Sequence, residues 1–144
     1  MDKGIYCLIL ENAACTLPVG GLGEVPFRAG WHVYVGSALG PGGLSRVRRH
    51  LRLAARRDAP PRWHIDRLLL SPRFRVRYAV CAPTALRLEC RLAAALGSGG
   101  VAGFGASDCS CRSHLFYRSA DPLPEAERAF RNLGLSCTSK RIKE

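Results

Sequence analysis

Two apolar runs near the start of the chain have the composition of β-strands. Residues 4–10 are almost wholly apolar, which is typical of a strand covered on both faces. Residues 32–36 form a second β-prone run, and the glycines at 20–23 indicate a turn before it. Between residues 73 and 80, arginine alternates with Phe, Val and Tyr, which is the period of a half-exposed strand. We therefore expect three strands, of which the first two run antiparallel.

Four other segments have the pattern of helices. They are bounded by glycine or proline signals and comprise residues 44–57, 63–70, 84–96 and 121–132. Residues 115–117 predict a short strand or packing segment, and residues 139–144 are expected to be frayed. Because no repeat or linker interrupts the pattern, we interpret residues 1–144 as a single domain that mixes helices and strands.

Composition supports a folded protein that does not enter a membrane. The chain has 144 residues, of which 47% are hydrophobic, enough for a substantial core. No apolar run approaches the roughly 20 residues that a bilayer-spanning helix needs, and no signal peptide is visible, so we expect a cytoplasmic protein. The seven cysteines are odd in number and scattered, and we interpret them as reduced and mostly structural.

The charge favours a phosphate polymer as partner. Lys and Arg number 22 against 11 Asp and Glu, and only three of the basic residues are lysines. Arginine forks match phosphate oxygens, so the excess indicates nucleic acid, although a composition biased towards arginine would give the same count. Clustering favours the first explanation, because Asp58 and Asp66 are the only acids between Glu24 and Glu89.

The basic helix expected from residue 44 presents two kinds of polar position. Arg46 and His50 lie one turn apart at the edge of its apolar stripe and face the same space. A partly buried histidine that bonds a carbonyl is the alternative for His50. The rest of the surface carries arginines that either contact DNA phosphates or form a solvated face, namely Arg48, Arg49, Arg52 and Arg56.

Glu89 is the least ordinary position of the expected helix 84–96. On the helical wheel it falls opposite Arg87 and Arg91, among apolar residues. A carboxylate there loses hydration unless it is paired or binds a cation. It is therefore either a ligand for a hard divalent ion such as Mg²⁺ or one half of an ion pair, with Arg46 as a candidate partner.

These positions together resemble a known family. Gly4-Ile5-Tyr6, Tyr34-Val35-Gly36, Arg46 and Glu89, in this order, resemble the GIY-YIG nuclease superfamily. Residues 34–44, 63–66 and 105–117 resemble one of its branches, which is catalogued as a domain of unknown function and is sometimes fused to an endonuclease III-type repair glycosylase. The similarity covers about residues 3–117, which leaves 118–144 as a helical extension and tail. The resemblance implies an α/β fold with a small three-stranded mixed sheet flanked by helices.

The resemblance also implies metal-dependent hydrolysis of DNA phosphodiesters, in DNA repair or processing. Tyr6 would be general base or water-positioning residue, and Tyr34 would orient the nucleophile or a metal-bound water. Arg46 would stabilise charge on the phosphoryl group, and Glu89 would hold a single Mg²⁺ or Mn²⁺ ion. His50 stands where relatives carry a tyrosine or histidine near the nucleophile. The implied partners are DNA and a repair glycosylase or another repair protein, with no membrane.

The chain departs from the superfamily at one position. Relatives often carry an asparagine beyond the glutamate helix, whereas none lies between Glu89 and Tyr117, where Asp108 is the candidate substitute. A non-catalytic nucleic-acid-binding module that keeps the nuclease fold is therefore the alternative function. His64 and Asp66 belong to the branch motif and either line the site, bind DNA or cap a short helix.

A cysteine- and histidine-containing loop supports a third, weaker alternative, a structural or zinc-binding adaptor. Cys109-x-Cys111-x-x-His114 has the ligand types for zinc, but no fourth partner follows at a familiar spacing. We therefore expect an ordered loop with buried thiols and no zinc.

Overall fold

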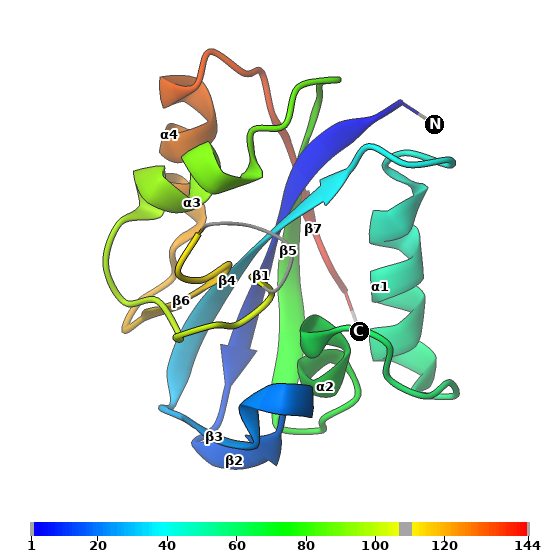
Figure 1. Cartoon of the computed structure of the whole chain (residues 1–144), viewed down its shortest axis with the longest axis vertical. Helices are drawn as coiled ribbons and strands as arrows, with labels where there is room; N and C mark the ends of the chain where they lie inside the picture. Colours follow the sequence, from blue (N-terminus) through cyan, green and yellow to red (C-terminus); the bar gives the residue numbers. More distant parts are fainter. Residues whose placement is uncertain (1, 107–110, 144) are drawn as a thin grey trace.

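A five-stranded antiparallel sheet forms the centre of the protein, with two helices on each face (Figure 1). The computed structural model describes residues 2–106 and 111–143. The sheet has the strand order β6-β4-β1-β5-β7, and a separate ribbon pairs β2 with β3. The strands are β1 (Gly4–Asn12), β2 (Cys15–Pro18), β3 (Glu24–Phe27), β4 (Gly30–Ala38), β5 (Phe74–Pro83), β6 (Leu115–Arg118) and β7 (Thr138–Arg141). The expected mixture of helices and strands is confirmed, but the sheet is larger than three strands and every pairing is antiparallel.

Strand β1 is the centre of the sheet and buries both of its faces, as its apolar run predicts. It pairs with β4 on one side and β5 on the other. Side chains alternate between the faces of a strand, so β1 contributes to two cores. Ile5, Cys7 and Ile9 pack in the core that includes α3 (Glu89–Leu96) and α4 (Leu123–Asn132). Tyr6, Leu8 and Leu10 pack in the core beneath α1 (Ser45–Arg56) and α2 (His64–Leu69).

The ribbon of β2 and β3 is a feature that the sequence did not predict. The turn expected at 20–23 is present as the short 3-10 helix η1 (Gly20–Leu22), and Gly20 and Gly23 have positive φ there. The strands on either side are only four residues long and contain Pro18 and Pro26. Because proline cannot donate to a strand ladder, sequence rules discount such segments, although an isolated two-stranded ribbon tolerates them.

The helices match the expected ones except at the start of α3. Helix α1 ends where Arg57 adopts a left-handed conformation, and α2 and α4 lie within their predicted ranges. Helix α3 begins at Glu89 and not at Thr84. The Thr84 side chain accepts a hydrogen bond from the Leu86 amide, and such a local bond competes with helix formation. Of the helices in the described ranges, none is long and apolar enough to pass through a bilayer.

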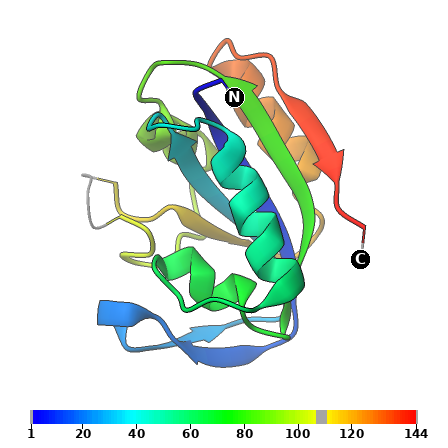
Figure 2. The same ribbon diagram turned by 90° about the vertical axis from the view of Figure 1, so that its right-hand side faces the viewer.

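The C-terminal segment is part of the sheet and not a frayed end. Strand β7 pairs with β5 at the sheet edge, so the expectation for residues 139–144 is wrong for 139–141 (Figure 2). Just before α4, the Arg118 guanidinium forms a double hydrogen bond with Glu125 and also donates to the carbonyls of Leu96 and Ser98. One side chain therefore joins α4 to the end of α3 and to the loop that follows it.

Two of the cysteines form a disulfide, which corrects the expectation that all are reduced. Cys90 in the first turn of α3 is bonded to Cys111, 21 residues later, with their Cα atoms 5.7 Å apart. Cys7, Cys15, Cys81 and Cys137 are free. Spacing alone could not reveal this pair, because the loop after α3 must fold back before the two residues meet.

We predict that Arg118→Lys destabilises the fold. Lysine cannot reproduce the double hydrogen bond with Glu125 while it also reaches two carbonyls, so the free energy of unfolding should fall by about 1–3 kcal/mol. Urea unfolding followed by circular dichroism measures the change. Arg131→Lys, on the exposed side of α4, is the matched control. Equal stabilities of the two variants would contradict the anchoring role of Arg118.

Candidate functional site

The sheet itself brings the two motif tyrosines together. Tyr6 on β1 lies opposite Gly36 on β4, and Tyr34 occupies the neighbouring position on the same face of β4. The rings of Tyr6 and Tyr34 have centroids 6.4 Å apart. A Cβ atom added at Gly36 would lie 2.5 Å from the Tyr6 hydroxyl oxygen, so the ring lies across a position that only glycine leaves open. The glycine of the second motif is therefore required by the tyrosine of the first.

Helix α1 adds an imidazole to this pair. The Tyr6 hydroxyl and His50 Nε2 form a buried hydrogen bond of 2.7 Å. The His50 ring centroid lies 5.5 Å from that of Tyr6 and 6.4 Å from that of Tyr34. The hydrogen-bond partner of His50 is therefore a phenol. The alternative expectation from the sequence, a bond to a carbonyl, is not what the structure shows.

Burial sets the protonation of all three groups. It raises the pKa of Tyr6 well above its ordinary value and raises the pKa of Tyr34, with smaller effects from nearby charges. Burial also lowers the pKa of His50 to about 4. Near neutral pH the phenols are protonated and the imidazole is uncharged. In this state the phenols can donate hydrogen bonds, and the imidazole can accept one.

Arg46 lies beside the tyrosines, at the edge of the apolar face of α1. It is half-buried, and its Nη1 donates to the Ser37 carbonyl at 2.9 Å. Its positive charge lowers the pKa of both Tyr6 and Tyr34 against the larger effect of burial. Within the described part of the chain, Arg46 and Glu89 do not form the ion pair that the sequence left open. The guanidinium is thus held by the end of β4, close to the two hydroxyls.

The charge of Glu89 also acts at this site, although α3 begins later than the sequence suggested. Glu89 is the first residue of α3, and the helical wheel holds from there on, because Leu92, Ala93 and Leu96 are buried and Arg91 is exposed. It does not hold before Glu89, where Leu86 is 64% exposed, and a glutamate in a first helical turn is also favourable. Burial is the largest cause of the raised pKa values of Tyr6 and Tyr34. The Glu89 carboxylate raises both pKa values further, so its charge acts at the tyrosine pair.

The chemistry of Glu89 fits a hard cation. The side chain is half-buried, and no hydrogen bond or ion pair to it is formed by the residues the structure describes. A single carboxylate with water and phosphate oxygens is a typical environment for Mg²⁺. Glu89 is the residue that would hold such an ion, and its charge acts on both tyrosines.

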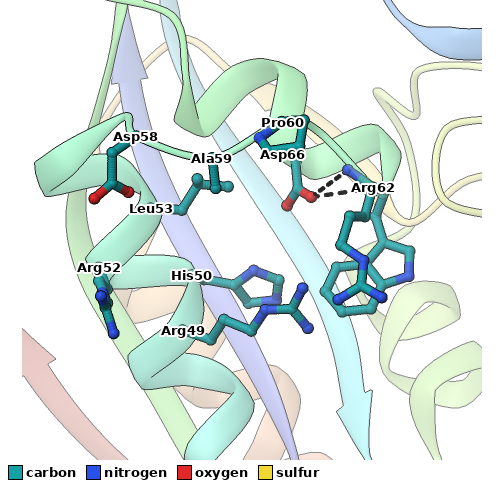
Figure 3. Close-up of a pocket in the computed structure, with 10 residues that line it drawn as sticks. Arg49, His50, Arg52, Leu53, Asp58, Ala59, Pro60, Arg62 and Asp66 are labelled. Atoms are coloured by element: carbon teal, nitrogen blue, oxygen red, sulfur yellow. Dashed lines mark hydrogen bonds between the residues drawn. The ribbon is translucent and has the colours of Figure 1, made fainter.

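A cavity of about 590 Å³ opens beside His50, between α1 and the start of α2. Figure 3 shows Arg49 and His50 from α1 and Asp66 from α2 projecting into the same space. Trp63 forms one wall, and its ring lies 5.9 Å from the His50 ring. The cavity provides an approach to the buried tyrosine–histidine cluster, through His50.

Three arginine side chains surround Trp63 at the rim of this cavity. The sequence did not lead us to expect a role for this tryptophan. It is 38% exposed, and the guanidinium carbons of Arg49, Arg46 and Arg62 lie 4.6, 5.2 and 6.0 Å from its ring centroid. A tryptophan that directly precedes a helix within an arginine-rich segment is the signal that could have found it. An aromatic plane surrounded by arginines suits the bases and phosphates of a nucleic acid.

The two polar residues of the branch motif have structural partners. Asp66 Oδ2 accepts hydrogen bonds from the amides of Arg62 and Trp63, so it caps the start of α2 while it lines the cavity. His64 Nδ1 accepts a hydrogen bond from the Gly105 amide at 2.8 Å. Of the three possible roles, capping is confirmed for Asp66, and His64 fixes the loop before β6. Asp108 lies outside the described residues.

The outer arginines of α1 are exposed, and two of them approach the cavity. Arg48, Arg49, Arg52 and Arg56 all lie on the solvent side of the helix. Arg49 and Arg52 also line the cavity. Arginines therefore extend from the outer face of α1 to the cavity beside His50, which Asp58 and Asp66 also line.

Comparison with known proteins identifies the family. The model of the family described as "Domain of unknown function DUF123" matches residues 5–135, and the chain belongs to that family. The match extends beyond residue 117, where the resemblance from the sequence ended, and includes α4. No curated protein and no solved structure gives a significant match.

We predict that acid destabilises the protein partly through His50. The pKa of this residue is lowered from 6.5 to about 4 on folding, so the unfolded chain binds more protons in this interval. The contribution is complete above about pH 6.5 and is lost as the pH falls towards 4. His32, whose pKa burial also lowers to about 4, adds to the effect in the same direction.

Chemical unfolding at about pH 7 and about pH 4.5 measures this loss for the wild type and for His50→Gln, which keeps a polar partner for Tyr6. The decrease in unfolding free energy should be smaller in the variant by about 2 kcal/mol. Equal decreases in the two proteins would show that His50 is not a buried neutral histidine.

Proposed function

We propose that this member of the DUF123 family is a metal-dependent endonuclease of the GIY-YIG type, which hydrolyses phosphodiester bonds in DNA during repair or processing. The observation that carries the proposal is the 2.7 Å hydrogen bond between Tyr6 and His50, in a cluster with Tyr34 that the charges of Arg46 and Glu89 reach. These side chains come from β1, β4, α1 and the start of α3. Their convergence supports a shared chemical role more strongly than any one of them does.

Each residue suits a different part of phosphodiester hydrolysis. The Tyr6 and Tyr34 hydroxyls orient the attacking water, and His50 fixes the Tyr6 hydroxyl. Arg46 stabilises the negative charge that develops on the phosphoryl oxygens. A hard divalent cation held by Glu89 would supply Lewis acidity and neutralise the leaving oxygen.

The surface around the cavity supports a nucleic-acid substrate. Exposed arginines of α1 contact phosphates, and Trp63 offers a stacking surface next to His50. The cavity is about 590 Å³, which is of the size that accommodates a small ligand or one nucleotide. A backbone that follows α1 would therefore bring a phosphate towards the tyrosine–histidine cluster.

Burial of the cluster favours a second candidate, a binding module without catalysis. Tyr6 is 1% exposed and His50 is 2% exposed, so a phosphate in the cavity meets little of either side chain. A protein that keeps the arginine surface and never exposes the cluster would bind DNA and leave it intact. The two candidates differ in whether any duplex is cleaved in the presence of a divalent cation.

We predict that Glu89→Gln abolishes cleavage and leaves DNA affinity within about twofold, because the variant loses only the cation ligand. Loss of a metal interaction worth several kcal/mol lowers the rate by at least about 100-fold. The assay uses nicked, branched and damaged duplexes with Mg²⁺, Mn²⁺ or EDTA. Glu24→Gln, at an exposed position in β3, is the control.

Cleavage by Glu89→Gln at the wild-type rate would remove the metal role of this residue. Binding by the wild-type protein without cleavage of any duplex would support the binding module instead.

We predict that the double variant Arg49→Ala/Arg52→Ala weakens DNA binding and reduces the magnitude of the slope of log K against log salt concentration by about 2, because two phosphate contacts are lost. Fluorescence anisotropy with a labelled duplex at several salt concentrations measures the slope. Arg128→Ala/Arg131→Ala removes the same charge from exposed positions of α4, on the opposite face of the sheet (Figure 1). Equal slopes for the two double variants would place the DNA elsewhere.

A further inference from the structure

Three side chains with soft or borderline ligand atoms meet beside Glu89. Cys90 lies in the first turn of α3, Cys111 in the loop after it, and His114 directly before β6. Their ligand atoms all lie within 4.8 Å of one another. His114 Nε2 is 3.2 Å from the Cys111 sulfur, and the two sulfurs form the disulfide described above.

The backbone holds His114 in place for this contact. Its amide donates to the Phe104 carbonyl and its carbonyl accepts from the Val35 amide, both at 2.8 Å. The residue is 4% exposed, and its imidazole ring also has a hydrogen bond with the backbone of Gly105. Metal-binding histidines typically use their second nitrogen in this way, because the bond fixes the tautomer and the ring orientation.

The spacing of these atoms suits a tetrahedral zinc ion after reduction. With Zn–S near 2.3 Å and Zn–N near 2.0–2.1 Å, a tetrahedral site places sulfur and nitrogen about 3.5 Å apart and two sulfurs about 3.8 Å apart. The distance from His114 to Cys111 is already close to the first value. Once the disulfide opens, the two sulfurs need only a small displacement to reach the sulfur–sulfur distance of a tetrahedral site.

We propose that reduced Cys90 and Cys111, together with His114, form a zinc-binding site with two thiolates, one imidazole and one open position. Breaking the disulfide takes two electrons, which a thiol or a phosphine supplies. Two monothiols become a disulfide and transfer their two protons to the cysteine sulfurs. A phosphine instead takes the oxygen of one water molecule and becomes its oxide, and the two protons of that water go to the cysteine sulfurs. Zn²⁺ then displaces the two thiol protons.

A neighbouring cavity gives access to the site. It has a volume of about 560 Å³, and Cys90, Cys111 and Phe116 are part of its lining. A reductant and an aquated metal ion can therefore reach the sulfurs. The expectation of no zinc was based on a missing fourth partner for Cys109, Cys111 and His114. Cys109 lies outside the described residues, and the start of α3 supplies Cys90 as a ligand that the sequence did not suggest.

The site would join the first turn of α3 to the strand that borders Tyr34. Cys90 directly follows Glu89, and β6 pairs with β4 through Tyr34 and Leu115. Both the disulfide and a zinc ion connect these segments, so either one fixes the position of Glu89 relative to the tyrosines. The zinc site is thus a separate centre from the Glu89 cation site, although the two are adjacent.

Zinc stoichiometry tests the proposal. The full-length protein is reduced with a phosphine, incubated with Zn²⁺, desalted and measured by mass spectrometry for metals. We expect one zinc per wild-type chain and the same for the controls Cys15→Ser, a free thiol elsewhere, and Glu89→Gln. Cys90→Ser and His114→Ala should bind at least about 10-fold more weakly, in line with the loss of a metal ligand.

Cobalt substitution of the wild type gives a readout that does not depend on a variant's folding. Tetrahedral Co²⁺ with two thiolates should show ligand-to-metal charge-transfer bands and intense visible bands in the reduced protein and neither in the oxidised protein. Absence of stoichiometric zinc or of these bands in the reduced wild type would overturn the proposal. Full zinc binding by Cys90→Ser, or loss of zinc from Glu89→Gln, would also overturn this three-residue site.

Discussion

The Tyr6 ring lies across the backbone of Gly36, and the arrangement of the site follows from this contact. Any side chain at position 36 would occupy the space of the ring, so the strand pairing and the glycine together fix the direction of the phenol. The hydroxyl then lies where His50 of α1 can bond it. The pairing of Tyr6 with Gly36, the absence of a Cβ atom at Gly36 and the position of His50 on α1 thus determine the central hydrogen bond.

The position of this cluster under α1 and α2 gives it unusual electrostatics. The interior has few ways to stabilise a charge, so the phenols remain protonated and the imidazole remains neutral. Charged groups are instead placed around it: the charges of Arg46 and Glu89 act on the tyrosines, and Arg46, Arg49 and Arg62 surround Trp63 beside His50. Such an arrangement surrounds an uncharged cluster with charged side chains.

The Cys90–Cys111 disulfide adds a constraint between the start of α3 and the loop before β6. Helix α3 begins only at Glu89, because the preceding residues form a local turn. A short helix with a free start would leave Glu89 poorly fixed, whereas a covalent or metal link at the next residue holds it. The same loop reaches back to β6 and β4, and Arg118 joins its other end to α4. The family match through residue 135 is consistent with a fold in which these parts form one unit.

Local signals in the sequence determined most of the secondary structure and the identity of the motif residues. The apolar run of β1, the glycines before α1 and the alternation in β5 each act over a few neighbouring residues, so their outcome could be predicted without the rest of the chain. Glu89 was selected by a helical wheel that applies only from this residue onwards, because Thr84 forms a local hydrogen bond and the helix begins later than expected. Contacts between distant segments, by contrast, were decided only by the tertiary structure: β7 on β5, Cys90 with Cys111 and His114, and Trp63 against His50. Their energies depend on burial and geometry that exist only after the sheet has formed, and nothing in the spacing of the residues encodes them.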